Sequence, residues 1–205
     1  IAQSGGIFEA KGFAAPCEVS RSTITNYLKV LETTLAVHVI RPFNARRPNE
    51  IISAPKVYAF DTGFICYHRG WKDLRAEDLG ALWEHYVLNE MMARMQSRRI
   101  NYWRDKRGHE IDFVIAGRRA QAPGGGQSSG GGAHPVAIEC KWSAGEFDSG
   151  NLLAFRRQHP RGENFVVAQD VARPYVRSYS DVKVRFICLS SLGEALLNGD
   201  DRGKR

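Results

Sequence analysis

The sequence predicts a two-part protein of mixed class, α/β (α+β): a small helical module that ends in a hairpin, then an α/β sandwich built on one mixed sheet. Three observations predict this. Residues 22–35 repeat apolar side chains at helical spacing, and extended segments follow them. Segments 110–115 and 136–141 alternate as strands do. Helical patterns at 78–96 and 150–159 flank those strands, which is the order of a layered α/β domain.

The composition is that of an ordinary globular protein, with 43% hydrophobic and 25% charged residues in 205. No apolar run approaches the roughly 20 residues of a membrane helix, and no signal peptide is recognisable. We therefore expect a cytoplasmic protein without a membrane partner. The chain starts at Ile1 rather than Met, so we expect a fragment of a longer protein. Its four cysteines lack metal-site spacing, which predicts buried free thiols.

The formal net charge is +7 and the isoelectric point about 9.4. This charge favours a polyanionic partner such as nucleic acid, although general solubility explains it equally well. The oligomeric state does not follow from the sequence.

Residues 1–70 are predicted to form a winged helix-turn-helix. A short helix and turn at 14–20 precede the helix at 22–35, for which Ser22 is the expected N-cap. A strand at 37–40, a basic turn at 41–50 and an extended segment at 51–60 supply the wing. The apolar face expected to pack inward comprises Ile24, Tyr27, Leu28, Leu31 and Leu35.

In winged helices the second helix enters the major groove and nearby basic side chains meet phosphates. The expected groove-facing residues are Thr23, Thr25, Asn26 and Lys29. The expected wing contacts are Arg41, Arg46 and Arg47. The alternative is a winged helix that only packs against its neighbours.

Residues 76–195 are predicted to form the sandwich, interrupted by a flexible Gly-rich insert at 123–134. The expected strands are 100–103, 110–115, 136–141, 164–168 and 184–189. A helix at 78–96 opens the domain, a second at 150–159 follows the third strand, and a short helix ends it.

Two of these strands bring charged side chains together. Asp112 lies on one face of strand 110–115, and Glu139 and Lys141 share one face of strand 136–141. If the strands pair, the two carboxylates and the ammonium converge. Carboxylates so close are costly unless a cation binds them, and hard oxygen ligands suit Mg²⁺ or Mn²⁺. Glu84 and the Cys140 carbonyl are further candidate ligands.

Such a site could hydrolyse phosphodiester bonds, because a metal ion polarises a phosphate oxygen and activates water. Lys141 would orient that water or stabilise negative charge. The alternatives are ordinary: Glu-x-Lys on a strand is most often an exposed ion pair, and Glu90 either competes with Glu84 or pairs with an arginine. The basic run beside the site either grips phosphates or is a solvated face. Its members are Arg98, Arg99, Arg104, Lys106 and Arg107, of which the last three are candidate DNA contacts.

These residues resemble the PD-(D/E)xK nuclease superfamily, especially archaeal Holliday-junction resolvases. The matching stretches are Gly80-Ala-Leu-Trp-Glu84, Glu110-Ile-Asp112-Phe-Val and Ala137-Ile-Glu139-Cys-Lys141. The resemblance implies a PD-(D/E)xK-type α/β sandwich. It also implies a catalytic set of Glu84, Asp112, Glu139 and Lys141, with Mg²⁺ as cofactor.

From about residue 5 to 195 the chain is also similar to the C-terminal region of predicted prokaryotic AAA-type ATPases. The resemblance there rests on residues 19–28, 54–64, 79–87 and 102–112. It implies a P-loop ATPase domain as a partner outside this chain, which lacks a Gly-x-x-x-x-Gly-Lys-Ser/Thr motif. Three functions are therefore weighed: a metal-dependent DNA nuclease, a catalytically silent DNA-binding module, and a scaffold for ATPase assembly.

Overall fold

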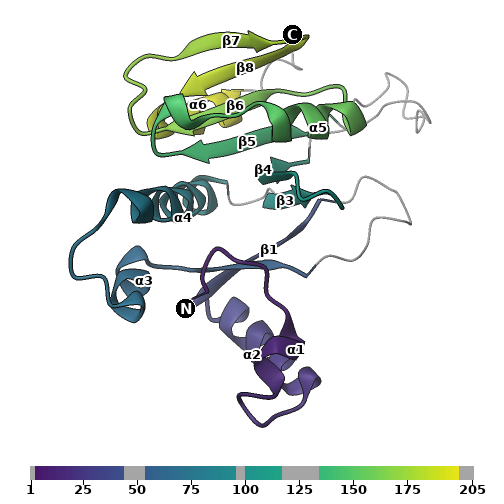
Figure 1. Cartoon of the computed structure of the whole chain (residues 1–205), viewed down its shortest axis with the longest axis vertical. Coiled ribbons are helices and arrows are strands. Elements are labelled where there is room, and N and C mark those ends of the chain that lie inside the picture. The colour runs from purple at the N-terminus through teal and green to yellow at the C-terminus, as the bar shows by residue number, and fades with distance from the viewer. Residues whose placement is uncertain (1–2, 44–53, 96–99, 117–133, 199–205) are drawn as a thin grey trace. The chain divides into compact units, whose positions relative to one another are not determined.

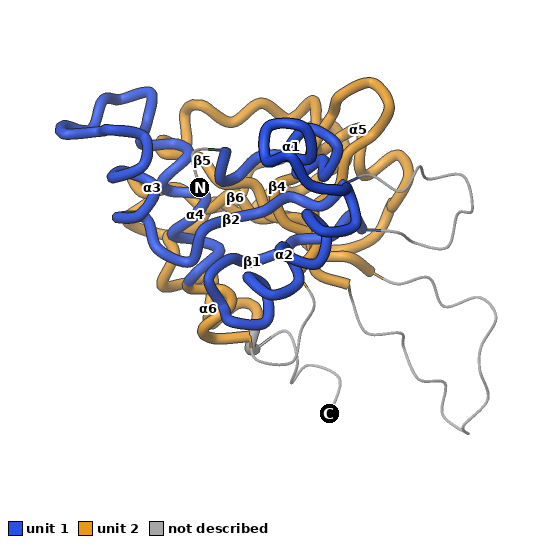
Figure 2. The backbone as a smooth tube through the Cα atoms, turned by 90° about the horizontal axis from the view of Figure 1, so that it is seen from below, with its two compact units in different colours: residues 1–89 blue, residues 90–205 orange. Residues whose placement is uncertain are grey.

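The computed structural model describes residues 3–43, 54–95, 100–116 and 134–198. It forms two compact units, Ile1–Asn89 and Glu90–Arg205 (Figure 2). Helices and strands occur in both units, so the predicted α+β class is confirmed. The sequence places helix 78–96 wholly in the second domain, whereas the units divide it, and the predicted domain limits stay a prediction.

The first unit opens with helices α1 (Ala10–Ala14) and α2 (Arg21–Thr33). Strands β1 (Val37–Pro42) and β2 (Lys56–Ala59) follow and pair antiparallel, with Val37 opposite Ala59 and Ile40 opposite Lys56. Two helices followed by a hairpin is the order that the sequence predicts. The first helix starts four residues earlier than expected, and residues 44–53 of the predicted wing lie outside the described residues.

Helix α2 begins two residues earlier than Ser22 as N-cap would set it. Ser20, in extended conformation, is its N-cap, and its Oγ accepts a hydrogen bond from the Thr23 N–H at 3.1 Å. The cap satisfies a backbone donor that the first helical turn leaves without a partner. Ser22 instead lies within the first turn, where its hydroxyl contacts the Ser20 hydroxyl at 2.7 Å.

The predicted packing face of α2 is wrong in most of its positions. Ile24 is buried, and Leu28 is partly buried. Tyr27 is 58% exposed, Leu31 44% and Leu35 68%. Spacing groups these side chains on one side of a helix, but it does not require another surface to cover them.

Helix α3 (Thr62–Arg69) follows the hairpin. Asp61 caps it by accepting a hydrogen bond from Phe64 N at 3.0 Å, and Gly70 ends it in the left-handed conformation that glycine adopts without penalty.

Helix α4 (Ala76–Arg94) is the longest in the described residues. The apolar pattern of the sequence predicts an inward stripe of Leu79, Leu82, Trp83, Tyr86, Val87 and Met91. Val87 and Met91 are buried, but Tyr86 is 48% exposed. His85 and Leu88 are buried instead. The inward surface of α4 is therefore rotated from the one that the apolar pattern predicts.

The second unit holds a six-stranded mixed sheet within the described residues (Figure 1). Its order is β3-β4-β5-β6-β8-β7. The strands are β3 (Ile100–Arg104), β4 (Glu110–Ile115), β5 (Val136–Lys141), β6 (Asn164–Ala168), β7 (Tyr175–Tyr179) and β8 (Val182–Ile187).

Four of these strands were predicted within one residue. The fifth, β8, starts two residues earlier than expected, and β7 was missed. Strands β3, β4 and β5 form an antiparallel meander, whereas β5–β6 and β6–β8 are parallel. Strand β7 pairs antiparallel with β8 at the edge. The sheet is therefore mixed, as predicted.

Helices α5 (Gly150–Gln158) and α6 (Leu189–Asn198) lie on opposite faces of this sheet (Figure 1). A short 3₁₀ turn, η1 (Ala144–Glu146), links β5 to α5. Phe155 of α5 packs edge-on against Trp103 at 5.2 Å between ring centroids, and both rings are buried. Tyr102 is also fully buried, so both aromatic side chains of β3 belong to the core.

Arg156 of α5 is a buried cation that binds the backbone just before β5 and just before β6. Its guanidinium donates to the carbonyl oxygens of Pro135, Arg161 and Glu163 at 2.7–3.0 Å. Burial lowers the pKa of Arg156 to about 10. The carbonyl cage replaces the water that burial removes, as buried charged groups require.

All four cysteines are free thiols, as predicted. Only Cys140 is buried, so the expected burial is wrong for Cys17, which is exposed, and too strong for Cys66 and Cys188. In the described ranges, no helix has the length and apolar character to cross a membrane.

Candidate functional site

The pairing of β4 with β5 places the predicted carboxylates at one end of the hairpin. Phe113 pairs with Ile138, and the ladder continues to Ile115 opposite Val136. One residue beyond that pair, the same antiparallel register sets Asp112 opposite Glu139, so their side chains belong to the same face. The predicted pairing of these strands is confirmed.

Asp112 replaces part of the backbone ladder with its side chain. Its Oδ2 accepts a hydrogen bond from the Cys140 backbone N–H at 2.8 Å. The described β4–β5 pairing stops at Phe113 and Ile138, just before this contact. A carboxylate keeps further acceptor capacity after one such bond, and Asp112 is only partly buried.

Glu139 and Lys141 form an ion pair along β5. Lys141 Nζ lies 3.2 Å from Glu139 Oε2 and donates a hydrogen bond to it. The Glu139 side chain is 3% exposed and that of Lys141 27%. The surface ion pair that is the ordinary alternative for Glu-x-Lys does not describe a glutamate at this depth.

The charge on Lys141 is stabilised by both carboxylates. Burial alone would lower the pKa of Lys141, but the negative charges of Asp112 and Glu139 outweigh that effect and raise the pKa above its usual value. Lys141 therefore holds its proton at neutral pH. The three side chains Asp112, Glu139 and Lys141 form one electrostatic cluster, which we call the β4–β5 charge cluster.

Glu84 belongs to the first unit and is engaged there. Its Oε1 accepts a hydrogen bond from the Tyr58 hydroxyl at 2.6 Å and lies 3.4 Å from Lys56 Nζ. Lys56 is almost fully buried. Lys56 and Tyr58 had no predicted role, because a strand pattern does not show which helix residue their polar ends meet.

Within the described residues, no group of three or more His, Cys, Asp or Glu side chains is placed to hold a metal ion. The β4–β5 charge cluster supplies two carboxylates. That number matches the usual protein contribution to a magnesium site, where waters and substrate phosphates complete the coordination. The donors are hard oxygens, which suit Mg²⁺ or Mn²⁺. The Cys140 carbonyl stays a predicted ligand.

Two further glutamates, Glu90 and Glu110, lie beside arginines. Glu90 pairs with Arg94 at 3.0 Å, so its predicted pairing with an arginine is confirmed. Glu110 lies 3.7 Å from Arg104. Three basic residues at the turn between β3 and β4 are exposed and stay candidates for phosphate contact: Arg104, Lys106 and Arg107.

On α2, two of the predicted groove-facing side chains form hydrogen bonds within the helix and its cap. Thr23 Oγ1 contacts the Ser20 hydroxyl at 2.8 Å, and Thr25 Oγ1 donates to the Arg21 carbonyl at 3.0 Å. Asn26 and Lys29 are exposed. These two side chains are the better placed of the four for contact with a partner.

Of the three predicted wing contacts, only Arg41 lies in the described residues. Arg41 forms a two-pronged ion pair with Glu32 of α2, with contacts of 2.8 and 2.9 Å. This pairing offsets its charge before any phosphate arrives. Arg46 and Arg47 lie outside the described residues.

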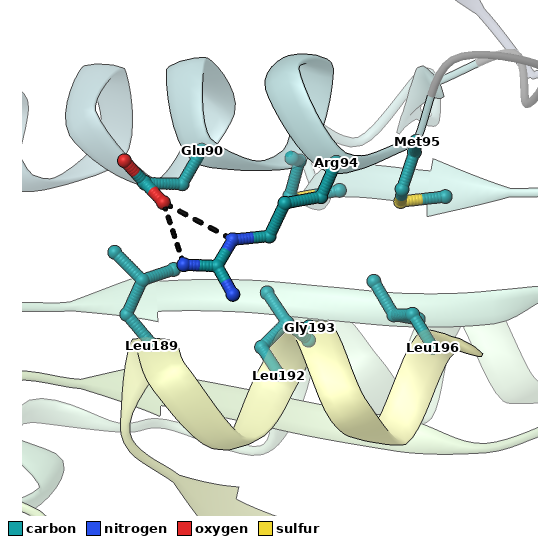
Figure 3. A pocket seen from close by; sticks show the side chains of 8 residues that line it. Glu90, Arg94, Met95, Leu189, Leu192, Gly193 and Leu196 are labelled. Atoms are coloured by element: carbon teal, nitrogen blue, oxygen red, sulfur yellow. Dashed lines mark hydrogen bonds and ion pairs between the residues drawn. The ribbon is translucent and has the colours of Figure 1, made fainter. Parts of the chain in front are cut away.

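A small pocket opens between the end of α4 and α6, both in the second unit (Figure 3). Met91, Met95, Leu192 and Leu196 give it an apolar lining, and the Glu90–Arg94 ion pair lies at its rim. The Arg94 guanidinium passes so close to Gly193 that a Cβ there would meet its Nη1 at 2.9 Å. The pocket is a packing gap between helices, apart from the charge cluster.

Sequence comparison locates the cluster within a recognised domain. Residues 79–179 match a domain of unknown function (DUF4143). The DUF4143 match contains Glu84 and all three members of the β4–β5 charge cluster. It ends before β8, although β8 lies between β6 and β7 in the sheet. The compact second unit therefore extends beyond the matched segment.

Residues 1–75 match a second domain of unknown function (DUF8612). Uncharacterized proteins of Mycobacterium tuberculosis and Mycobacterium bovis are each 30% identical to the chain over 115 residues. The aligned part is 54% of this chain and 26% of each relative. The chain thus spans about a quarter of the length of the curated relatives it matches.

Proposed function

We propose that this chain acts on DNA and that its second unit hydrolyses phosphodiester bonds with a divalent metal ion. The observation that carries the proposal is the convergence of Asp112, Glu139 and Lys141 at the open end of the β4–β5 hairpin. The resemblance of the same residues to PD-(D/E)xK nucleases supports it.

In this proposal Asp112 and Glu139 hold Mg²⁺ or Mn²⁺, with Glu84 as a further carboxylate. The metal ion, when bound, supplies Lewis-acid activation of the phosphate and of a water. Lys141, which lies beside both carboxylates, acts in this proposal as a cation that binds a phosphate oxygen. Its ammonium stabilises negative charge that develops during hydrolysis.

The first unit supplies DNA binding in this proposal. Helices α1 and α2 and the β1–β2 hairpin have the element order of a winged helix. Asn26 and Lys29 are the side chains best placed to reach a groove. We propose further that the longer protein contains a P-loop ATPase domain, which the resemblance to AAA-type ATPases implies and which fits relatives much longer than this chain.

One observation favours a second candidate, a catalytically silent DNA-binding or regulatory module. Glu139 is buried and already paired with Lys141, so the charge cluster is partly neutralised without a metal. A buried pair of this kind can persist as a structural element. The two candidates differ in metal binding.

Titration calorimetry with Mn²⁺ distinguishes them. The parent chain should bind Mn²⁺, and Glu139→Gln should weaken binding at least ~10-fold, because a neutral amide replaces a charged oxygen ligand. Glu110→Gln is the matched control, since Glu110 precedes Asp112 on the same face of β4 but pairs with Arg104. Its affinity should equal that of the parent.

If the parent does not bind, or if both variants bind like the parent, metal-dependent hydrolysis is wrong and the silent module stands. Asp112→Asn provides a second test should Glu139→Gln fold poorly by circular dichroism, because an asparagine oxygen can still accept from Cys140 N. Mg²⁺-dependent nicking of plasmid DNA by the parent, lost in Glu139→Gln, would complete the case.

A further inference from the structure

The outer edge of the second unit carries aromatic rings and positive charge together. Tyr175, Arg177 and Tyr179 alternate along the edge strand β7 and so share one of its faces. Tyr175 stacks on Phe186 of β8 with 4.9 Å between ring centroids. The Arg177 guanidinium lies 5.2 Å from the Tyr175 ring centre and 5.6 Å from that of Phe186.

Phe147, just after η1, completes this group. It packs edge-on against Tyr179 and against Phe186, with centroids 5.3 and 5.5 Å apart. Phe186 is fully buried, whereas Tyr175, Tyr179 and Phe147 are partly open to solvent. We call Phe147, Tyr175, Arg177 and Tyr179 the β7 patch.

The strand register places the β7 patch on the same face of the sheet as the charge cluster. Glu139 is in register with Val166, Val166 with Phe186, and Phe186 with Tyr175. Side chains in register on neighbouring strands point to the same face. Strand spacing of ~4.8 Å sets Tyr175 about 14 Å from Glu139 across the sheet.

The charge of this edge suits a polyanion. Residues 171–187 contain four basic side chains and a single acidic one, Asp181. The basic four are Arg173, Arg177, Lys183 and Arg185, of which Lys183 and Arg185 lie on the face of the sheet opposite to Arg177. Arg177 is exposed, and in the part of the chain that the structure describes it contacts rings and no carboxylate. Its charge is therefore available to a ligand.

We propose that the β7 patch binds a single strand of nucleic acid, with Arg177 on a phosphate and the partly open rings against bases. Aromatic rings beside a basic side chain are the usual platform for single strands, because every base has a face that can stack.

This inference rests on the proposed function, because it names the strand that the same sheet face would present to the metal site. An acidic peptide pairing with the open edge of β7 is the competing occupant. Peptide pairing would use the backbone of β7, whereas the nucleic-acid proposal depends on the Arg177 guanidinium.

The test is fluorescence anisotropy with a short labelled oligothymidylate in EDTA, so that no cleavage contributes. Arg177→Gln should weaken binding by ~5–10-fold and lower the slope of log affinity against log salt by about 0.7, the value for one phosphate contact on a single strand. Arg177→Lys keeps the charge and should retain the slope of the parent.

Lys183→Gln is the matched control. It removes the same charge from the neighbouring strand, but Lys183 alternates with Val182 and Val184 and therefore lies on the opposite face from Arg177. It should bind like the parent. Because Arg177 is exposed, circular dichroism and Tm should be unchanged in both glutamine variants.

Equal affinities and salt slopes for the parent, Arg177→Gln and Lys183→Gln would overturn the proposal, and so would equal losses in the two glutamine variants. A parent that does not bind the oligonucleotide also overturns it. Metal binding at Glu139 is measured separately by calorimetry, so failure of the β7 patch and failure of the metal site are told apart.

Discussion

The imidazole of His85 fixes the start of the chain to α4 through a buried chain of hydrogen bonds. His85 Nδ1 lies 2.7 Å from the Ala81 carbonyl, which can only accept, so Nδ1 carries the proton. Nε2 then accepts from the Ser4 hydroxyl at 2.7 Å, and Ser4 Oγ accepts from Ala59 N at 2.6 Å. In this series of hydrogen bonds, every donor faces an acceptor only while His85 is neutral.

This arrangement predicts a pH-dependent stability. Burial lowers the pKa of His85 to about 4, and the charges of Arg69 and Lys56 act in the same direction against the Ala81 hydrogen bond. The unfolded chain, with a pKa near 6.5, takes up the proton first. Stability should therefore fall as pH drops from about 6.5 to about 4, by up to ~3 kcal/mol from this residue.

Urea unfolding at several pH values measures the effect. His85→Gln should remove this part of the pH dependence. The exposed His68 serves as control, and His68→Gln should keep the slope of the parent. A parent and a His85→Gln variant with parallel stability curves between pH 7 and 4 would contradict the account.

Gly162 is a second single-residue constraint, next to the carbonyl cage of Arg156. Its φ of +128° is unfavourable for other residues, and a Cβ would collide with the Pro135 carbonyl oxygen. Gly162→Ala should destabilise the chain by ~2–5 kcal/mol, combining backbone strain with overpacking. Gly108, at φ +89° with open space around it, is the control.

Thermal unfolding followed by circular dichroism compares the two alanine variants. Gly108→Ala should cost only the backbone strain, about 1–2 kcal/mol. Equal losses at the two positions would show that the Pro135 contact is not the cause.

At the scale of elements, the hydroxyl of Ser20 decides where α2 begins. Ser20→Ala should destabilise the first unit by ~1 kcal/mol, because the Thr23 N–H loses its acceptor. Ser22→Ala changes the second residue of the helix and should lower the stability by less than half as much. Chemical denaturation curves of the two variants provide the measurement, and the reverse ranking would restore Ser22 as the cap.

Strands were predictable where alternation is strong and both faces are buried. The limits of β4 and β5, and with them the placement of Asp112 opposite Glu139, follow from the period of two. Strand β7 was missed because an edge strand carries polar side chains such as Arg177 and Ser178 on both faces. The burial of α2 was overestimated because periodicity identifies a face but not what covers it.

The candidate site was predictable in its three sheet residues and not in their partners. The ion pair of Lys141 with Glu139 follows from their spacing on one strand face. The contacts of Glu84 with Tyr58 and Lys56 join residues 26 and 28 positions apart. Local patterns carry no signal for such pairs, which only the packing of helix against strand creates.

At the scale of the whole molecule, the strand order differs from the order along the chain. Strand β8 lies between β6 and β7, and it is the last strand in the described sequence. It contributes Val184, Phe186 and Ile187 to the core, all at most 1% exposed. The parallel ladder on β6 is therefore completed by residues about twenty positions further along.

This order has a consequence during biosynthesis. While the chain is being translated, β6 emerges with one hydrogen-bonding edge that has no strand to pair with until residues 182–187 follow it. Open strand edges recruit other strands, and partly made chains with exposed edges are prone to aggregate. A chain that ended at residue 179 would hold Asp112, Glu139 and Lys141 but would leave the β8-facing edge of β6 open, so residues 182–187 protect this sheet from aggregation.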